Sequence, residues 1–395
     1  MGTEHIDVVR RRTAVNLPPI EALSERYRPT ARRAARAAMA LAALSGDEQC
    51  IIFSQLCNVL DPGIAVAFGS ASSELWALTQ AQQQQLRADH EVAAALCRKL
   101  GKRSCKELPE AKSVDCSDKG LSAADLATLG TLGSVLPALE TLILTKTSAG
   151  PDGVPRLAER LGAGALPVVT FLDLSSVQLG DAGASALSAA LGRGALPRLE
   201  TLGLMYAAIG DAGLVALAPA LRRRPALEAL YLGHNPFYDE GLAALLAPPP
   251  PPAGAPPPPT GVLAKLKTLD LRRTHITDAG LVALAPALRR LPALEELDLI
   301  GNPFGDEGLA ALVAPPPAAG APSPPTGVLT KLRVLDLDET QIADAGCAAL
   351  ASALDSGVLP ALEVLGLEGI PASDASTAAV TEALARTTPR ALWRT

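Results

Sequence analysis

Leucine recurs along this chain in a short pattern, Leu-x-x-Leu-x-Leu, with small or polar residues between the leucines. Full copies begin at Leu139, Leu199, Leu227, Leu266, Leu294, Leu332 and Leu362, and less perfect ones begin at Ala111 and Val169. Successive copies lie 28 to 30 residues apart, except for two steps of 39 and 38 residues. A period of this length is the signature of a repeat array, in which each unit buries its apolar face against its neighbours.

Each repeat predicts a short strand, a turn and a helix. The leucine run predicts the strand, and an Ala-rich amphipathic stretch such as 214–223 predicts the helix. The turn ends in Gly-Asp-Ala-Gly or a variant, and we expect its aspartate to cap the helix that follows, at Asp181, Asp211, Asp239, Asp278, Asp306 and Asp344. These aspartates lack the Asp-x-Asp spacing of a calcium site. Pro219 and Pro286 lie inside predicted helices and predict a kink or an early end there.

The two long steps contain proline-rich inserts, at 247–260 and 314–326, which hold 9 and 6 of the chain's 34 prolines. We interpret them as insertions into a regular array rather than as domain linkers. They should protrude as polyproline II, and either bind a proline-reading domain or reflect compositional drift. A larger duplication is also visible, because residues 225–249 nearly repeat as 292–316.

These features resemble the leucine-rich repeat family, in its ribonuclease-inhibitor-like subclass. The resemblance implies an α/β fold, a right-handed solenoid with a parallel sheet on the concave side, helices on the convex side and a helical N-terminal cap. The expected domains are a disordered or loosely ordered segment 1–29, a helical cap 30–105 and the solenoid 106–395. The family's turn asparagine occurs only at Asn235 and Asn302, so we expect an incomplete ladder of buried side chains and a less rigid array.

In such a solenoid the residues between the leucines line the concave face. One column of this face runs through Ile143, Asp173, Gly203, Tyr231, Asp270, Asp298, Asp336 and Gly366. Its three successive aspartates would lie about 4.8 Å apart, and like charges directly opposite destabilise a sheet. The acidic patch comprises Asp270, Asp298, Asp336, Asp338 and Glu339, with Arg272 and Arg273 near enough to compensate in part. The patch either binds a basic segment of a partner or is a solvated polar face without a ligand.

A second patch on the same face is formed by Met205, Tyr206, Tyr231 and His234 on neighbouring strands. Exposed aromatic side chains are enriched at interface hot spots, and the chain has only four tyrosines. The patch is therefore either part of a binding surface, which would span residues 199–339, or incidental packing between strands.

The first 105 residues lack the repeat. Thr30–Leu44 predicts a helix, and segment 46–78 combines acidic residues, Asp61-Pro62 and a closing Trp76. This order resembles an F-box, the helical motif that binds the Skp1-like adaptor of ubiquitin ligases, although the opening Leu-Pro pair is missing and the connector after Leu56 is too long. The alternative is a helix face that caps the open end of the solenoid, which a repeat array requires.

Charge and composition argue against several classes of protein, namely those that bind nucleic acid, span a membrane, bind zinc or are held by disulfides. The net charge of −6 divides into 13 basic and 10 acidic residues in 1–105, and 22 basic and 31 acidic residues in the remainder, or +3 and −9. An acidic repeat region with 3% aromatic residues disfavours nucleic acid as a partner. No uncharged apolar run reaches the length of a membrane span. The six cysteines contain no CxxC pair, which favours buried free thiols over zinc ligation or disulfides.

No catalytic motif is present, so we expect neither an enzyme nor a cofactor. The sequence predicts a protein-binding scaffold in the cytoplasm or the nucleus. One alternative is a substrate adaptor of a ubiquitin ligase that binds a Skp1-like protein through 46–78. Another is an activator of Ran-type GTPases, for which Arg272 and Arg273 are the candidate arginines.

Overall fold

A computed structural model describes residues 45–247, 263–314, 329–387 and 392–393. The segment 1–29, the predicted helix at 30–44 and almost all of both proline-rich inserts lie outside the described residues. The described residues form two compact units, one made of residues up to 58 and 62–87, and the other of 59–61 and all residues from 88 onward.

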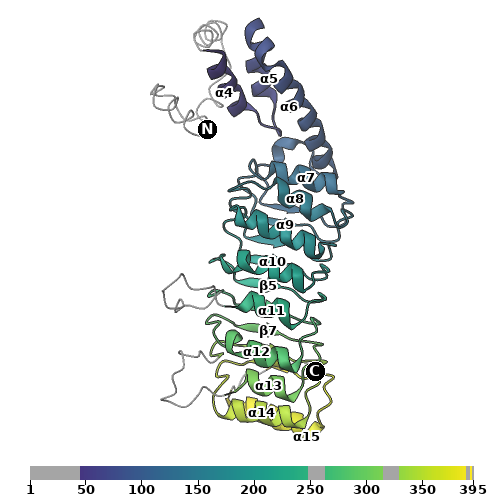
Figure 1. Cartoon of the computed structure of the whole chain (residues 1–395), viewed down its shortest axis with the longest axis vertical. Coiled ribbons are helices and arrows are strands. Elements are labelled where there is room, and N and C mark those ends of the chain that lie inside the picture. The colour runs from purple at the N-terminus through teal and green to yellow at the C-terminus, as the bar shows by residue number, and fades with distance from the viewer. Residues whose placement is uncertain (1–44, 248–262, 315–328, 388–391, 394–395) are drawn as a thin grey trace. The chain divides into compact units, whose positions relative to one another are not determined.

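The repeats form one sheet of ten strands in the order of the sequence, and every pair is parallel (Figure 1). The strands are β1 (Ser113–Asp115), β2 (Thr141–Ile143), β3 (Phe171–Asp173), β4 (Thr201–Gly203), β5 (Ala229–Tyr231), β6 (Thr268–Asp270), β7 (Glu296–Asp298), β8 (Val334–Asp336), β9 (Val364–Gly366) and β10 (Leu392–Trp393). The predicted α/β solenoid is confirmed.

A helix follows each of the first nine strands, and consecutive helices pack against one another. They are α7 (Ala123–Leu132), α8 (Gly153–Arg160), α9 (Gly180–Gly192), α10 (Asp211–Arg222), α11 (Asp239–Leu246), α12 (Asp278–Leu288), α13 (Asp306–Leu312), α14 (Asp344–Asp355) and α15 (Asp374–Thr387). The leucines of the repeat pattern are buried between sheet and helices. The first and third residues of each strand lie on the other side of the sheet, which we call the strand face.

The strand register is the predicted one. Asp173 pairs with Gly203, Tyr231 with Asp270, and Asp298 with Asp336. The whole predicted column from Ile143 to Gly366 is therefore confirmed, and its members lie on adjacent strands.

The prediction for the two helical prolines was wrong, because α10 continues through Pro219 and α12 continues through Pro286. Proline removes the hydrogen bond to the carbonyl four residues earlier. That carbonyl belongs to Val215 in α10 and to Val282 in α12, and both residues are exposed on the outer side of their helices. Water can therefore replace the missing donor, and the helix is not forced to end.

The aspartates of the Gly-Asp-Ala-Gly turns do cap helices, but not their own. Asp211 is the first residue of α10, and its Oδ1 accepts the amides of Tyr238 (2.9 Å) and Gly241 (2.7 Å) at the start of α11. Asp278 does the same for Gly305 and Gly308 at the start of α13. The expectation that each aspartate caps the helix it begins was therefore wrong. Such carboxylates link each repeat to the next, at Asp181, Asp211, Asp239, Asp278, Asp306 and Asp344.

The second glycine of this turn makes room for the neighbour's carboxylate. A Cβ atom at Gly213 would lie 2.4 Å from Oδ1 of Asp181, and one at Gly280 would lie 1.8 Å from Oδ1 of Asp239. The spacing of aspartate and glycine in the motif is therefore explained by contact between adjacent repeats.

Arginines serve the opposite ends of the helices in the same way. Arg193 donates to the carbonyls of Ala158 (2.6 Å) and Leu161 (3.2 Å) at the end of α8. Arg222 donates to Ala244 and Ala247 at the end of α11. Negative side chains at helix starts and positive ones at helix ends both match the helix dipole, here across repeat boundaries.

The two turn asparagines are buried and fully bonded. Asn235 accepts the amides of Ala207 (3.1 Å) and Ile209 (3.0 Å) from the previous repeat and donates to the carbonyls of Leu204 and Leu232 (both 2.7 Å). Where alanine replaces asparagine, the backbone carbonyl of Ala207 accepts the amides of Leu179 and Gly180 instead. The ladder of side chains is incomplete, as predicted.

The N-terminal unit contains α4 (Gly46–Leu56), α5 (Gly63–Gly69) and the first part of α6 (Ser73–Lys99). Ser45 and Glu48 form a capping box at the start of α4. The last part of α6 and the short 3-10 helix Cys105–Glu107 belong to the unit of the repeats, where Leu96, Cys97 and Leu108 join the core beside β1.

Candidate binding surface on the strand face

Three carboxylates lie side by side on the strand face, at the last residues of β6, β7 and β8. Each accepts the backbone amide two residues further along, with Asp270 bonded to Arg272 (3.1 Å) and Asp298 to Ile300 (3.1 Å). Asp336 makes the same bond to Asp338 (3.3 Å). An aspartate at this position terminates the strand with a turn, so these side chains have a structural role that does not depend on a ligand.

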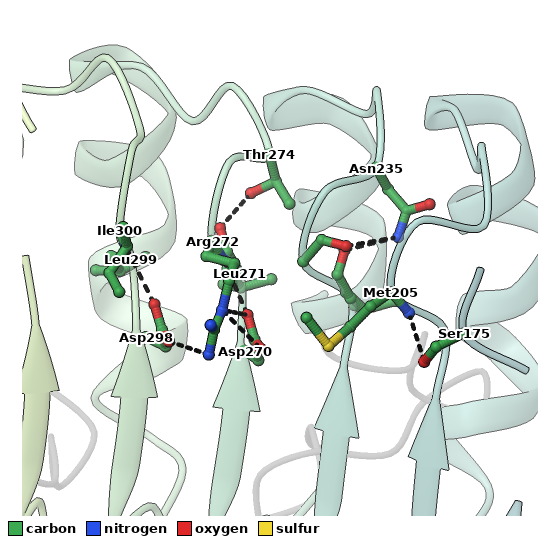
Figure 2. A network of polar contacts seen from close by, with 12 residues as sticks. Ser175, Met205, Asn235, Asp270, Leu271, Arg272, Thr274, Asp298, Leu299 and Ile300 are labelled. Carbon is green, nitrogen blue, oxygen red and sulfur yellow. Dashed lines mark hydrogen bonds and ion pairs between the residues drawn. The ribbon is translucent and has the colours of Figure 1, made fainter. Parts of the chain in front are cut away.

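One arginine serves two of the three carboxylates. Nε of Arg272 donates to Oδ1 of Asp270 (3.1 Å), and its Nη2 lies 2.6 Å from Oδ2 of Asp298 (Figure 2). Asp270 and Asp336 are only 2% and 4% exposed, so neither of these two carboxylates is a solvated part of the face. They are buried because neighbouring glycines, Gly233 and Gly366, let backbone and side chains approach closely.

The electrostatics of Asp298 reflect this crowding. Burial first, and then the charges of Asp270 and Asp336, raise its pKa to about 6, against the opposing effects of the Ile300 amide and the Arg272 guanidinium. The pKa of Tyr231, the neighbour of Asp270 in the same column, is also raised, first by burial and then by Glu296 and Asp270. A surplus of negative charge therefore remains in this part of the face after Arg272 has paired.

The outer acidic residues lie in the turns that follow β8 and β9. Arg273 forms an ion pair with Glu339, and its side chain crosses Gly301 to reach that residue. Asp338 accepts the backbone amide of Glu368. The predicted acidic patch is therefore brought together by the structure, and both predicted arginines are engaged within it.

The turn residue after each strand has a positive φ, and this position forms a row across the repeats. The row includes Tyr206 (φ 53°), His234 (φ 59°) and Arg273 (φ 50°), whereas Gly301 takes the same position after β7. Bulky side chains are uncommon in this conformation. The rings of Tyr206 and His234 stack with their centroids 4.0 Å apart. Burial, and then Arg273 and Arg272, lower the pKa of His234 against the opposing effect of Asp270.

The predicted aromatic patch is thus only partly one cluster. Tyr206 and His234 are in contact, while Tyr231 lies in the aspartate column and the amide of Met205 donates to Ser175 (Figure 2). A second stacked pair was missed, formed by Tyr238 and His275 with centroids 5.1 Å apart. Comparing the duplicated repeats would have found it, because Tyr238 aligns with a glycine and His275 with an alanine in the other copy.

The segment with the F-box-like order is mostly helical, and it lies in the N-terminal unit except for residues 59–61, which belong to the unit of the repeats. Four of its large apolar side chains are exposed to solvent, at Ile51, Ile64, Trp76 and Leu78. Phe53, by contrast, is fully buried.

Among the described residues, no group of three or more His, Cys, Asp and Glu side chains is arranged to hold a metal ion. No helix in the described part of the chain is both long and apolar enough to span a bilayer. All six cysteines are free thiols.

Comparison with known proteins identifies the repeats. The family described as "Leucine Rich repeat" matches six stretches of the chain, 165–188, 196–218, 225–246, 262–285, 291–313 and 328–351. The ribonuclease inhibitor of Sus scrofa is 32% identical over 133 residues, which cover 34% of this chain and 25% of that protein.

Among solved structures, the "Crystal structure of TLR13-ssRNA13 complex" matches with 21% sequence identity and a TM-score of 0.41 over 72% of this chain and 33% of that one. The chain thus spans only a quarter of the curated relative and a third of this structure. Six of the repeats thus match the leucine-rich repeat family, and part of the chain is similar to a ribonuclease inhibitor.

Proposed function

We propose that this chain is a non-catalytic protein-binding scaffold and that its strand face, with the turns at the strand ends, receives the partner. The observation that carries the proposal is the way two duplicated pairs of repeats have diverged. Residues 199–224 align with 266–291, and residues 225–247 align with 292–314, without gaps.

In the first pair the helical halves are identical. Residues 211–223 and 278–290 have the same sequence, DAGLVALAPALRR, including exposed positions such as Val215 and Val282. Six of the eight differences lie in the strand and the turn, one immediately precedes the strand, and one follows the helix. The changed pairs are Glu200/Lys267, Gly203/Asp270, Met205/Arg272, Tyr206/Arg273, Ala207/Thr274, Ala208/His275, Gly210/Thr277 and Arg224/Leu291.

The second pair diverged in the same places. Its helices share the sequence DEGLAAL at 239–245 and 306–312, in which Glu240 and Ala243 are exposed. The changed pairs are Ala229/Glu296, Tyr231/Asp298, Gly233/Ile300, His234/Gly301, Tyr238/Gly305 and Leu246/Val313.

Exposure alone does not account for this distribution. Substitutions at exposed positions away from special features usually change stability by less than about 0.5 kcal/mol, so drift would also have altered the exposed side of the helices. The differences instead follow the strand face and its turns. This distribution supports a face whose chemistry was changed while its scaffold was kept, as expected of a recognition surface.

The charge of the face favours a partner with a basic segment. Exposed or half-exposed acids extend from β7 to the turn after β9, at Glu296, Asp298, Asp338, Glu339 and Glu368. Arg272 and Arg273 neutralise only part of them. The stacked pair of Tyr206 and His234 lies at the same edge and adds aromatic surface of the kind enriched in hot spots.

Site-specific photo-cross-linking tests the proposal. A benzophenone side chain placed at Tyr206 or at Glu296 should trap a protein partner in the native cell. The same group at Val215, which is exposed on the outer side of α10, should trap none. Identical products from all three positions, or products from Val215 alone, would contradict the strand face as the binding surface.

We infer that the protein acts in the cytoplasm or the nucleus, because six unpaired cysteines fit a reducing compartment. A fusion of the full chain to a fluorescent protein tests this assignment by microscopy. Localisation to a secretory organelle would contradict it.

A second candidate function is substrate adaptor of a ubiquitin ligase, and the exposed apolar side chains of the N-terminal unit favour it. Trp76 is 41% exposed, although burial of an indole is normally favourable. The full chain should co-purify a Skp1-like adaptor, and Trp76→Ala should abolish this. Val92→Ala is the matched control, because Val92 is exposed on the same helix but lies in the other unit. No observation favours the GTPase-activator reading, since Arg272 and Arg273 are both held in ion pairs.

A further inference from the structure

The carboxylates of β6, β7 and β8 form a group in which one arginine contacts two of the three members. We call Asp270, Asp298 and Asp336 the carboxylate triad. The register places them on three adjacent strands, with neighbours about 4.8 Å apart. Arg272 contacts the first and second carboxylates, through its Nε and Nη2 atoms. Asp336 lies one strand further from Arg272.

The middle carboxylate has the least favourable position for a negative charge. Asp298 has a carboxylate on each side, whereas Asp270 and Asp336 each have one, because the column continues with Tyr231 beyond Asp270 and Gly366 beyond Asp336. Carboxylates that share a site cannot all ionise freely, and one of them takes up a proton more readily than usual. Asp298 is also the member of the triad that solvent can reach, with 19% of its side chain exposed.

Other charged groups around Asp298 do not reverse this conclusion. On its own strand, Glu296 is acidic, and on the β8 side Asp338 and Glu339 are acidic as well. On the β6 side, Arg273 is paired with Glu339. Arg272 is thus the one cation that directly contacts Asp298 among the described residues.

We propose that the carboxylate triad takes up one proton, on Asp298, in mildly acidic solution, so that the strand face changes its charge between neutral and mildly acidic conditions. The consequence for partner affinity rests on the proposed function, whereas the proton uptake itself does not. A partner with a basic segment would bind the ionised triad at neutral pH and bind more weakly after the proton is taken up. The expected loss of affinity between pH 7 and pH 5 is at most about tenfold, which is the full effect of one linked proton with a pKa of about 6.

The sign of the effect on stability follows from the same proton. The pKa of Asp298 is raised from its usual 3.8 to about 6 in the folded chain. Between these values the folded state binds more protons than the unfolded state, so stability rises as the pH falls through this window. Above it, the ionised Asp298 lowers stability. A neutral side chain of the same shape should therefore raise the melting temperature at pH 7.5, and the gain should fall to roughly half of that value at pH 5.

Melting temperatures of the full chain between pH 5 and 7.5 test the proposal. Asp298→Asn should melt about 2–4 °C above the wild type at pH 7.5, and the difference should shrink to roughly half of that at pH 5. Asp173→Asn is the matched control, because Asp173 terminates β3 with the same turn and pairs with Ile143 and Gly203 rather than with carboxylates. A pH profile unchanged in Asp298→Asn, or altered equally in both variants, would overturn the proposal.

A second measurement does not depend on any substitution. In the wild-type chain labelled with ¹³C at the aspartate side-chain carboxyl, one resonance should titrate with a midpoint near pH 6 and should be absent from Asp298→Asn. Titration of every aspartate below pH 5 would overturn the proposal. Because neither measurement uses a partner, failure to trap a partner at Tyr206 or Glu296 would leave this result intact and would count against the proposed function alone.

Discussion

The two copies of the duplicated repeats, 199–247 and 266–314, place different chemistry on the same backbone. The first copy carries rings and small residues on the strand face, with Tyr206 stacked on His234. The second carries the acids and Arg272, held together by ion pairs. Both copies keep a buried asparagine, with the same pattern of hydrogen bonds. The comparison teaches that the frame of a repeat is held by buried groups and by contacts between repeats, which leaves the face free to vary.

The copies also adapt to each other where they meet. Gly233 of the first copy lies beside Arg272 of the second, and a Cβ atom at this glycine would lie 2.6 Å from Cγ of that arginine. The corresponding residue in the second copy is Ile300. A glycine at position 233 is therefore required by Arg272 on the next strand. A residue of the strand face cannot always be replaced by its counterpart in the other copy unless its neighbour is replaced as well.

The largest expected effect concerns the frame that the copies share. Asn302→Ala should lower the free energy of unfolding by about 3 kcal/mol, because the amides of Thr274 and Ile276 and two carbonyls lose their buried partner. Asn235→Ala should cost about as much, as measured by chemical denaturation. Thr340→Ala is the control, since Thr340 occupies the same position but donates a single bond, to Leu337. An equal loss of unfolding free energy in Asn302→Ala and Thr340→Ala would contradict the idea that the buried asparagines hold the frame of the two copies.

A smaller effect is expected where the copies meet. Gly233→Ile, which installs the residue of the second copy, should cost about 2 kcal/mol through overpacking against Arg272. Arg272→Met, which installs the residue of the first copy, should relieve part of this cost. A double-mutant cycle in denaturant measures the coupling. Additive effects of the two substitutions would show that the positions vary independently.

The contacts between repeats should contribute less per residue. Asp278→Ala leaves the amides of Gly305 and Gly308 without their cap and should cost about 1 kcal/mol. Asp211→Ala should cost the same in the first copy. Glu307→Ala, at an exposed position in the first turn of α13, serves as the control and should cost only a few tenths of a kcal/mol. The idea fails if the substitutions at Asp278 and Glu307 are equivalent in thermal melts.

The smallest expected effect on stability concerns the rings. Tyr206→Gly removes the stack with His234 but relieves a positive φ. The two contributions are of similar size, about 1 kcal/mol each, so the melting temperature should hardly change. Trapping of the partner from Glu296 should nevertheless fall several-fold. A large loss of stability with unchanged trapping would mean that the ring pair is structural.

The fold could be predicted because the residues that determine each strand, turn and helix lie within a single repeat of the sequence. The leucine spacing predicts each strand, and equal steps between strands predict the register that brings Asp270, Asp298 and Asp336 together. Glycine or asparagine at single positions similarly predicts turns. In each case the relevant partners occupy the same place in every repeat.

The sequence predictions failed where the environment of a residue is set by the neighbouring repeat or by access of water. Asp211 was expected to cap α10 because it begins that helix, yet its carboxylate points to the start of α11. Asp270 was expected to line the strand face, and it does, but the alternation of strand residues does not show that Gly233 and Arg272 enclose it. Pro219 was expected to disrupt α10, but this depends on whether water reaches the carbonyl of Val215. The spacing of residues along the chain does not show toward which repeat a side chain points or which groups surround it.

The aspartate caps all point in one direction along the array, and this direction favours one order in which the repeats form. Asp181, Asp211 and Asp278 each serve the helix of the following repeat, so a helix finds its cap already in place once the preceding repeat has formed. A chain that leaves the ribosome from its N-terminus meets this requirement at every step, since the N-terminal part is available to fold first during synthesis. Growth from the other end would leave each newest helix uncapped until the repeat that precedes it in the sequence had formed.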